Sequence, residues 1–163
     1  MVKKASPQRD SLNINDIIME VMELVATEIG RHNISSHAEL ANDLPLVWGD
    51  RIELQQVLLN LIMNAIEAMS GAAQMQRSLS VSSEKDGPGG VLVAVSDSGA
   101  GLDEASLDRL FDAFYTTKAN GMGMGLAVSQ TIILRHDGWL WAAPNAPRGA
   151  IFRFRLPAGS EPA

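Results

Sequence analysis

The sequence predicts an α/β fold in which helices cover one face of a β-sheet. Three segments carry apolar residues at helical spacing, and several shorter segments alternate apolar and polar residues as half-buried strands do. The 163 residues, 46% of them hydrophobic, are enough to build one core of ordinary size. We therefore expect a single compact domain.

The first expected helix follows a possible edge strand at residues 12–14. Asn15 is placed to cap this helix, because its short polar side chain can accept a hydrogen bond from a backbone amide of the first turn. Apolar residues then recur at helical spacing over residues 17–29, which predicts an amphipathic helix.

Two short strands and a second helix are expected next. The strands, at residues 35–40 and 46–48, lie on either side of a turn, and Pro45 limits the second strand to a sheet edge or a strand start. Asp50 can cap the helix expected over residues 52–69, whose apolar residues form one face.

The second half of the chain predicts a hairpin, a third helix and two closing strands. The hairpin strands, at residues 79–83 and 91–97, flank a turn rich in Gly and Pro. An irregular stretch with a short helical piece at residues 106–111 comes next. The remaining expected elements are a helix from about residue 124 to 136 and strands at residues 139–141 and 151–156.

The two ends of the chain have no apolar period. We expect residues 1–10 to be a linker or the frayed end of something upstream, residues 11–158 to be the folded domain and residues 159–163 to be a disordered tail.

Composition excludes several classes of function. The net charge of −6 and the lack of a basic stripe argue against sequence-independent binding of nucleic acid, which needs clustered Lys and Arg. The chain has no cysteine, so a disulfide framework and a thiolate metal site are excluded. No apolar run approaches the roughly 20 residues that cross a bilayer, which predicts a soluble piece.

Two asparagines lie one turn apart on the polar side of the second helix. Asn60 and Asn64 are notable because Asn is a mediocre residue for a helix interior, so a pair of them suggests a role in binding. An amide oxygen suits Mg²⁺, which takes its other oxygens from water and substrate phosphates. We therefore expect Asn64 to bind Mg²⁺. Glu67, one turn further, either adds charge near that ion or faces solvent.

A carboxylate ends the second strand of the hairpin. Because side chains alternate along a strand, Asp97 shares a face with the apolar residues of 91–95, and that face must be buried. A buried carboxylate needs a partner, and an adenine amino group would serve. Gly99 and Gly101 then allow the backbone to approach a planar ligand. The alternative is a turn that only ends the strand.

Three glycines precede the third helix. Gly121, Gly123 and Gly125 can present backbone amides and a helix N-terminus to phosphates, or they can form a flexible hinge. Just upstream, the hydroxyls of Thr116 and Thr117 and the ammonium group of Lys118 can reach the same phosphates when the loop closes. The alternative for Lys118 is a solvated side chain.

In this fixed order, the segments resemble the N, G1, F, G2 and G3 boxes of bacterial sensor histidine kinases, within the GHKL ATPase superfamily. The residues that carry the resemblance are 60–65, 97–101, 111–118, 121–126 and 149–152. Two residues depart from the usual pattern: Ala113 replaces a Pro of the F box, and Ala150 replaces a Thr or Ser of the G3 box. The resemblance implies a two-layer α/β sandwich of the Bergerat type, in which helices cover one face of a mixed sheet and ATP lies between helices and sheet.

The same resemblance assigns residues to an ATP and Mg²⁺ site. It implies Asn64 for the metal, Asp97 for the adenine amine and the glycine loop for the phosphates. The complete expected nucleotide site, in which the first two residues are also expected to be catalytic, is Asn60, Asn64, Asp97, Gly99, Gly101, Thr116, Thr117, Lys118, Gly121, Gly123, Gly125 and Leu126.

Position 60 separates the two reactions that the superfamily performs. Related topoisomerases, mismatch-repair proteins and chaperones carry a Glu there, which orients the attacking water as a general base. An amide cannot take a proton, so Asn60 favours transfer to an outside acceptor over hydrolysis. A Mg²⁺-dependent ATPase and a degenerate nucleotide-binding regulatory module are the alternatives.

The family's phosphoacceptor is a histidine on a separate helical hairpin. The three histidines of this chain, His32, His37 and His136, do not fit that pattern, and we interpret each as structural or surface. The resemblance therefore implies the ATP-binding catalytic domain of a larger kinase, with residues 1–10 as the linker from the absent dimerisation hairpin. That hairpin would be the phosphoacceptor, and a response regulator would be an indirect partner. We expect a cytoplasmic, monomeric domain that binds ATP with little turnover, taken from a homodimeric protein.

Overall fold

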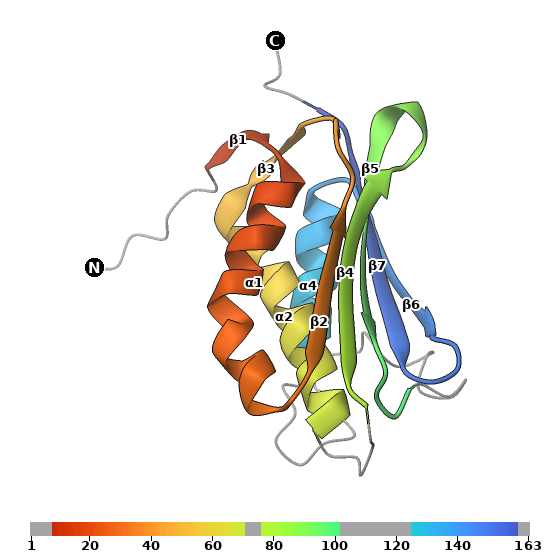
Figure 1. Cartoon of the computed structure of the whole chain (residues 1–163). Coiled ribbons are helices and arrows are strands. Elements are labelled where there is room, and N and C mark those ends of the chain that lie inside the picture. Colours follow the sequence, from red (N-terminus) through yellow and green to blue (C-terminus); the bar gives the residue numbers. More distant parts are fainter. Residues whose placement is uncertain (1–7, 71–75, 102–124, 160–163) are drawn as a thin grey trace.

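A five-stranded sheet and a layer of helices on one of its faces make up the fold (Figure 1). The computed structural model describes residues 8–70, 76–101 and 125–159. In their order across the sheet, the strands are β2 (Ser35–Leu40), β4 (Ser78–Lys85), β5 (Gly90–Asp97), β7 (Ala150–Pro157) and β6 (Trp139–Pro144). The β2–β4 pair is parallel and the other pairs are antiparallel, so the sheet is mixed.

The helical layer covers a single face of this sheet (Figure 1). Its members within the described residues are α1 (Ile14–Arg31), α2 (Arg51–Ser70) and α4 (Gly125–Arg135). Two short strands, β1 (Arg9–Leu12) and β3 (Val47–Asp50), pair antiparallel in a separate ribbon, and a short 3₁₀ turn, η1 (Gly87–Gly89), joins β4 to β5. The expected two-layer α/β sandwich with a mixed sheet is confirmed.

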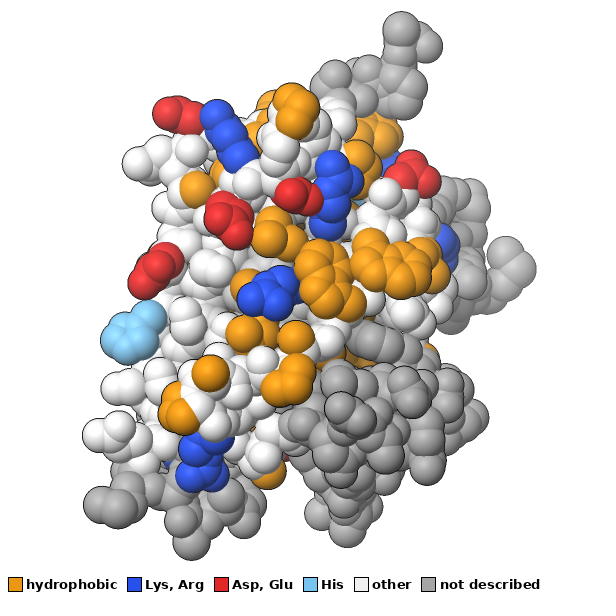
Figure 2. Space-filling view, turned by 90° about the vertical axis from the view of Figure 1, so that its right-hand side faces the viewer, with side chains coloured by type: hydrophobic (Ala, Val, Ile, Leu, Met, Phe, Trp, Pro, Cys, Tyr) orange, Lys and Arg blue, Asp and Glu red, His pale blue; other side chains and the backbone are white. Residues whose placement is uncertain are grey.

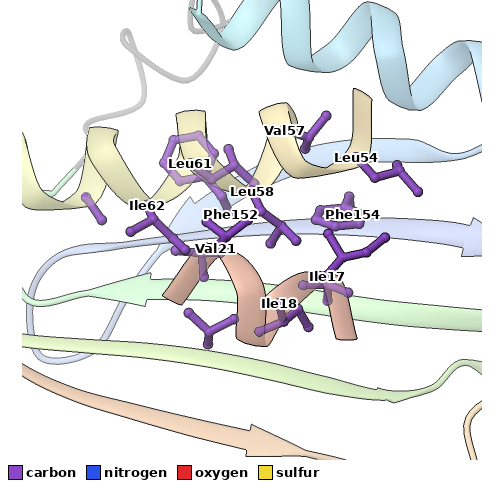
Figure 3. Close-up of a cluster of buried hydrophobic side chains, with 14 of the residues drawn as sticks. Ile17, Ile18, Val21, Leu54, Val57, Leu58, Leu61, Ile62, Phe152 and Phe154 are labelled. Atoms are coloured by element: carbon purple, nitrogen blue, oxygen red, sulfur yellow. The ribbon is translucent and has the colours of Figure 1, made fainter. Parts of the chain in front are cut away.

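The core lies between the helices and the inner face of the sheet. Phe152 and Phe154 of β7 are almost fully buried and lie opposite Val95 and Val93 of β5. Figure 3 shows these two rings among apolar side chains of α1 and α2, which include Ile17, Val21, Leu58 and Leu61. Period-two alternation in the strands and the apolar face of each helix therefore meet as expected.

Among the described residues, all helices lie on one face of the sheet and none covers the outer face (Figure 1). Trp139 and Trp141 of β6 lie opposite Arg155 and Arg153 of β7, on the side away from the helices. Figure 2 shows hydrophobic and basic side chains next to each other on this face. Arg155 also forms an ion pair with Asp86 at the β4–β5 turn.

The cap of α1 differs from the expected one. The helix begins at Ile14, and the side chain of Asn13 accepts a hydrogen bond from the amide of Asn15. Asn15 lies inside the first turn. Its side-chain nitrogen donates to the carbonyl oxygen of Ala41, and its side-chain oxygen accepts from the hydroxyl of Ser83 at 2.6 Å. Ile14 is completely buried, so the helix must start early enough to place it in the core.

The strands around the first expected turn also differ from the prediction. They do not pair with each other: β2 pairs with β4, and β3 pairs with β1, where Val47 lies opposite Leu12. A parallel pair needs a long crossover, and the chain between β2 and β4 supplies one that contains α2. The strand expected at residues 12–14 lies instead at Arg9–Leu12, so Arg9 and Asp10 of the expected linker pair within this ribbon.

Other elements follow the prediction closely. Asp50 caps α2, because its Oδ1 accepts from the amide of Glu53 at 3.1 Å, and β4 and β5 form the expected hairpin. The short helical piece at residues 106–111 lies outside the described residues. Across the described ranges, no helix is both long enough and apolar enough to span a bilayer.

Candidate functional site

The polar residues of the candidate site gather at one end of the two layers. The C-terminal part of α2, the end of β5 and the start of α4 lie together at the lower end of the molecule in Figure 1. Asn64 lies in the C-terminal half of α2, Asp97 is the last residue of β5, and Gly125, the first residue of α4, accepts a hydrogen bond from Asn60. The fold therefore brings the expected metal, adenine and phosphate residues to the same end.

Asp97 ends β5 on its buried face, as the strand period predicts. Asp97 is only 2% exposed. Oδ1 accepts hydrogen bonds from the amide of Gly99 at 2.8 Å and from the amide of Ala150 at 3.3 Å. Two backbone amides therefore hold this carboxylate oxygen in place at the end of β5.

Three glycines let the backbone pack tightly around this carboxylate. A Cβ on Gly99 would lie 2.7 Å from the carbonyl oxygen of Ala68 in the last turns of α2. Gly149, just before β7, has a φ of +103°, and a Cβ there would lie 1.8 Å from the carbonyl oxygen of Asp97. Gly101 has a φ of +86° and lies against Gly149. The end of β5 therefore contacts α2 and β7 directly through backbone atoms.

The two asparagines of α2 lie on consecutive turns beside α4. The amide nitrogen of Asn60 donates to the carbonyl oxygen of Gly125 at 3.2 Å and to the hydroxyl of Ser129 at 3.1 Å. Asn64 and Glu67 are half-buried on the same helix. Leu126, expected near the nucleotide, is partly buried against the core. Asn60 therefore connects α2 to Gly125, the last glycine of the loop before α4.

Five expected site residues lie outside the described ranges. They are Thr116, Thr117, Lys118, Gly121 and Gly123, together with the departure at Ala113. Of the glycine loop, the structure thus describes its last member, Gly125, which begins α4.

The donor set determines which metal site is chemically reasonable. Among the described residues, no group of three or more His, Cys, Asp or Glu side chains could hold a metal ion. Mg²⁺ does not require such a group, since it keeps several waters and takes oxygens from phosphates. A single amide oxygen from Asn64 fits Mg²⁺ that arrives with a nucleotide.

His136 has a structural role, as expected. It is 3% exposed, its Nε2 accepts from the amide of Asp50 at 3.0 Å, and its Nδ1 lies 2.8 Å from the carbonyl oxygen of Ile132. The carbonyl can only accept, so Nδ1 carries the proton and the ring is neutral. Burial lowers the pKa of His136 below its ordinary value. His32 bonds to the end of its own helix, and His37 lies exposed on the edge strand.

Two residues that contact the expected site residues are not among those that the sequence predicts: Ser129, which bonds to Asn60, and Gly149, which packs against Asp97. Ser129 is completely buried in α4, and its only sequence signal is a polar residue on a face that is otherwise formed by Ile132 and Ile133. Gly149 was noted as part of a motif, but its backbone conformation cannot be read from the residue types around it.

A family model places the chain among known proteins. The model described as histidine kinase-, DNA gyrase B-, and HSP90-like ATPase matches residues 49–160. The chain belongs to this family. The matched range extends from the end of β3 past the end of β7, so it includes both asparagines, Asp97 and Gly125.

Within the family, the similar proteins are sensor kinases. Sensor protein FixL of Bradyrhizobium diazoefficiens is 38% identical over 160 residues, which are 98% of this chain and 31% of FixL. Sensor protein TdiS of Thauera aromatica is 36% identical over 157 residues, which are 96% of this chain and 29% of TdiS. The chain thus spans less than a third of the length of these relatives.

Solved structures give the same result for the fold. The catalytic domain of histidine kinase ThkA superposes with a TM-score of 0.81 at 34% identity, covering 93% of this chain and 98% of that domain. ThkA in complex with response regulator protein TrrA gives a TM-score of 0.78 at 32% identity, covering 93% of this chain and 42% of that chain. The chain is therefore the counterpart of a histidine kinase catalytic domain.

Proposed function

We propose that this chain binds ATP and transfers the γ-phosphoryl group to a histidine on a separate dimerisation hairpin of a full-length sensor kinase. In that reaction the bond between the γ-phosphorus and the β,γ-bridging oxygen breaks, a phosphorus–nitrogen bond forms at the histidine and ADP leaves. The observation that carries the proposal is the side chain at position 60. Asn60 is an amide, and its nitrogen faces two acceptors of α4. It therefore has no basic atom for activating water.

The adenine end of the site rests on Asp97. Two backbone amides hold one of its oxygens, so the carboxylate is fixed at the end of β5. An acceptor held in place at this position suits the exocyclic amine of adenine. Gly99 and Gly101 let the backbone after this carboxylate pack closely against Ala68 of α2 and against Gly149.

The phosphate end rests on α2 and the glycine loop. Asn64 would hold Mg²⁺ through its amide oxygen, and the ion would supply charge neutralisation at the phosphates. We infer that Gly121, Gly123 and Gly125 supply backbone amides to the phosphates. Of these residues the structure describes Gly125, which begins α4, and the next residue, Leu126, is the expected nucleotide contact that packs against the core. Thr116, Thr117 and Lys118 complete the phosphate contacts.

The proposal extends to partners and location. The relatives are about three times longer than this chain, and ThkA has been solved with a response regulator, which supports a phosphoacceptor hairpin and a response regulator as partners of the whole kinase. We propose that the whole kinase is a homodimer, that the isolated domain is a monomer and that both act in the cytoplasm.

Calorimetric titration with ADP and a non-hydrolysable ATP analogue, with and without Mg²⁺, tests the site. Asp97→Asn keeps the shape of the side chain and removes its charge. We expect it to lower the binding affinity for both nucleotides at least tenfold. Asn64→Ala is expected to remove most of the gain in affinity that Mg²⁺ gives. Glu39→Ala, an exposed change on β2, is the control. No saturable binding in the wild type would refute the proposal.

Phosphoryl transfer is then measured with labelled ATP and a supplied histidine hairpin. Label on the hairpin with little release of inorganic phosphate is the expected result. Rapid phosphate release without a hairpin would instead identify a Mg²⁺-dependent ATPase, and binding without either reaction would identify a degenerate nucleotide-binding module.

A further inference from the structure

The side chain of Asn60 connects α2 to the N-terminal end of α4. The side-chain nitrogen of Asn60 reaches Gly125 and Ser129, which are four residues apart and therefore lie on consecutive turns of one face of α4. The carbonyl of Gly125 can only accept a hydrogen bond, so it is the nitrogen, and not the oxygen, of the amide that must face α4. This fixes the orientation of the Asn60 side chain.

Ser129 provides the second acceptor from inside the protein. The residue is 0% exposed, on the face that α4 turns toward the core. A buried hydroxyl without a partner is unfavourable, and alanine would fill nearly the same space, so packing alone does not explain a serine here. The contact with Asn60 does explain it.

The two contacts connect the two halves of the phosphate site. Gly125 is the last glycine of the loop before α4, and Asn64 lies one turn after Asn60 on α2. A shift of α4 relative to α2 would therefore change the spacing between the loop and the metal ligand. Asp97 lies on β5 and is held by other bonds, so such a shift leaves the adenine contact in place.

We propose that Ser129 is a positioning residue for the nucleotide phosphates: with Asn60, it holds the first turn of α4, and so the end of the glycine loop, in place against the metal-binding helix. This inference rests on the proposed function and assigns Ser129 a role in it. Asn60 contributes through these two contacts.

Removing the Ser129 hydroxyl tests the inference. Ser129→Ala leaves the amide of Asn60 with one acceptor fewer, and we expect the affinity for the Mg²⁺-bound ATP analogue to fall about three- to tenfold, the range for one lost hydrogen bond. The affinity for adenosine, measured in parallel, is expected to stay unchanged. Thr131→Ala is the matched control, because its hydroxyl lies on the same helix but bonds to the carbonyl of Ala127, and it should change neither affinity.

A double-mutant cycle shows whether Ser129 acts through Asn60. In an Asn60→Ala background, Ser129→Ala should have almost no further effect on the analogue. Ser129→Cys, which retains volume with a weaker acceptor, gives the same comparison if the alanine variant does not fold. Equal loss for analogue and adenosine, an additive cycle, or an unchanged analogue affinity in Ser129→Ala would each overturn the inference. If the wild type binds adenosine but not the analogue, or binds neither, the proposed function fails and this inference with it.

Discussion

Replacing Gly149 by alanine should damage the fold and the candidate site together. Gly149 has a φ of +103°, in a region that side chains rarely adopt, and such a conformation costs a non-glycine residue about 1–3 kcal/mol. A Cβ there would also lie 1.8 Å from the carbonyl oxygen of Asp97, so backbone must move. We expect the upper end of the range, a loss of about 3 kcal/mol in the free energy of unfolding.

For a domain of this size, that loss corresponds to a fall of about 6–12 °C in the melting temperature. Urea and thermal unfolding followed by circular dichroism measure it directly. Gly89→Ala is the matched control, because no atom lies within 4 Å of a Cβ at that exposed position. A variant at Gly149 that unfolds within about 0.5 kcal/mol of the wild type would refute the reasoning, because surface changes of no structural consequence fall in that range.

Two further predictions concern the N-terminus of α2. Burial favours the neutral form of His136 and lowers its pKa in the folded protein. As the pH falls, the unfolded chain therefore takes up a proton on this residue first, near pH 6.5. The contribution of His136 to the free energy of unfolding is full above that pH and is lost as the pH falls toward the lowered pKa of the folded state. His136→Gln should flatten this dependence between pH 7.5 and 5.5 in urea titrations, and an unchanged slope would contradict the assignment. Asp50→Ala removes the bond from the amide of Glu53 and should cost about 1 kcal/mol in the same assay. Asp50→Asn, which retains an acceptor, should stay close to the wild type, and equal losses for both variants would show that the cap is not the cause.

Local patterns were sufficient to predict most of the elements. The apolar face of α2, the hairpin of β4 and β5 and the alternation in β7 depend on periods of a few residues, and each was predicted within a few positions. The pairing of β2 with β4 and of β3 with β1 was not predicted, because strand partners far apart in the chain leave no local trace. Asn13 and Asn15 are both good caps, and the burial of Ile14, a tertiary effect, decides between them.

The candidate site divides in the same way. The burial of Asp97 follows from strand parity, and the structure adds which amides hold it. The two hydrogen-bond partners of Asn60, Gly125 and Ser129, lie 65 and 69 positions further along the chain, so no local spacing pattern predicts them. Ser129 is a small polar residue in an apolar pattern, which is a weak signal until the facing helix is known.

The alternation of Phe152 and Phe154 with Arg153 and Arg155 limits how this protein can change by insertion and deletion. An insertion of one residue at the start of β7, before Phe152, would shift the register of the residues after it, turning both guanidinium groups toward the core and both rings toward solvent. The strand has neighbours on both sides, so it cannot shift to relieve the error without breaking pairs with β5 and β6. Changes of length in this part of the chain are therefore confined to the turns before and after the strand, while the strand itself changes by substitution.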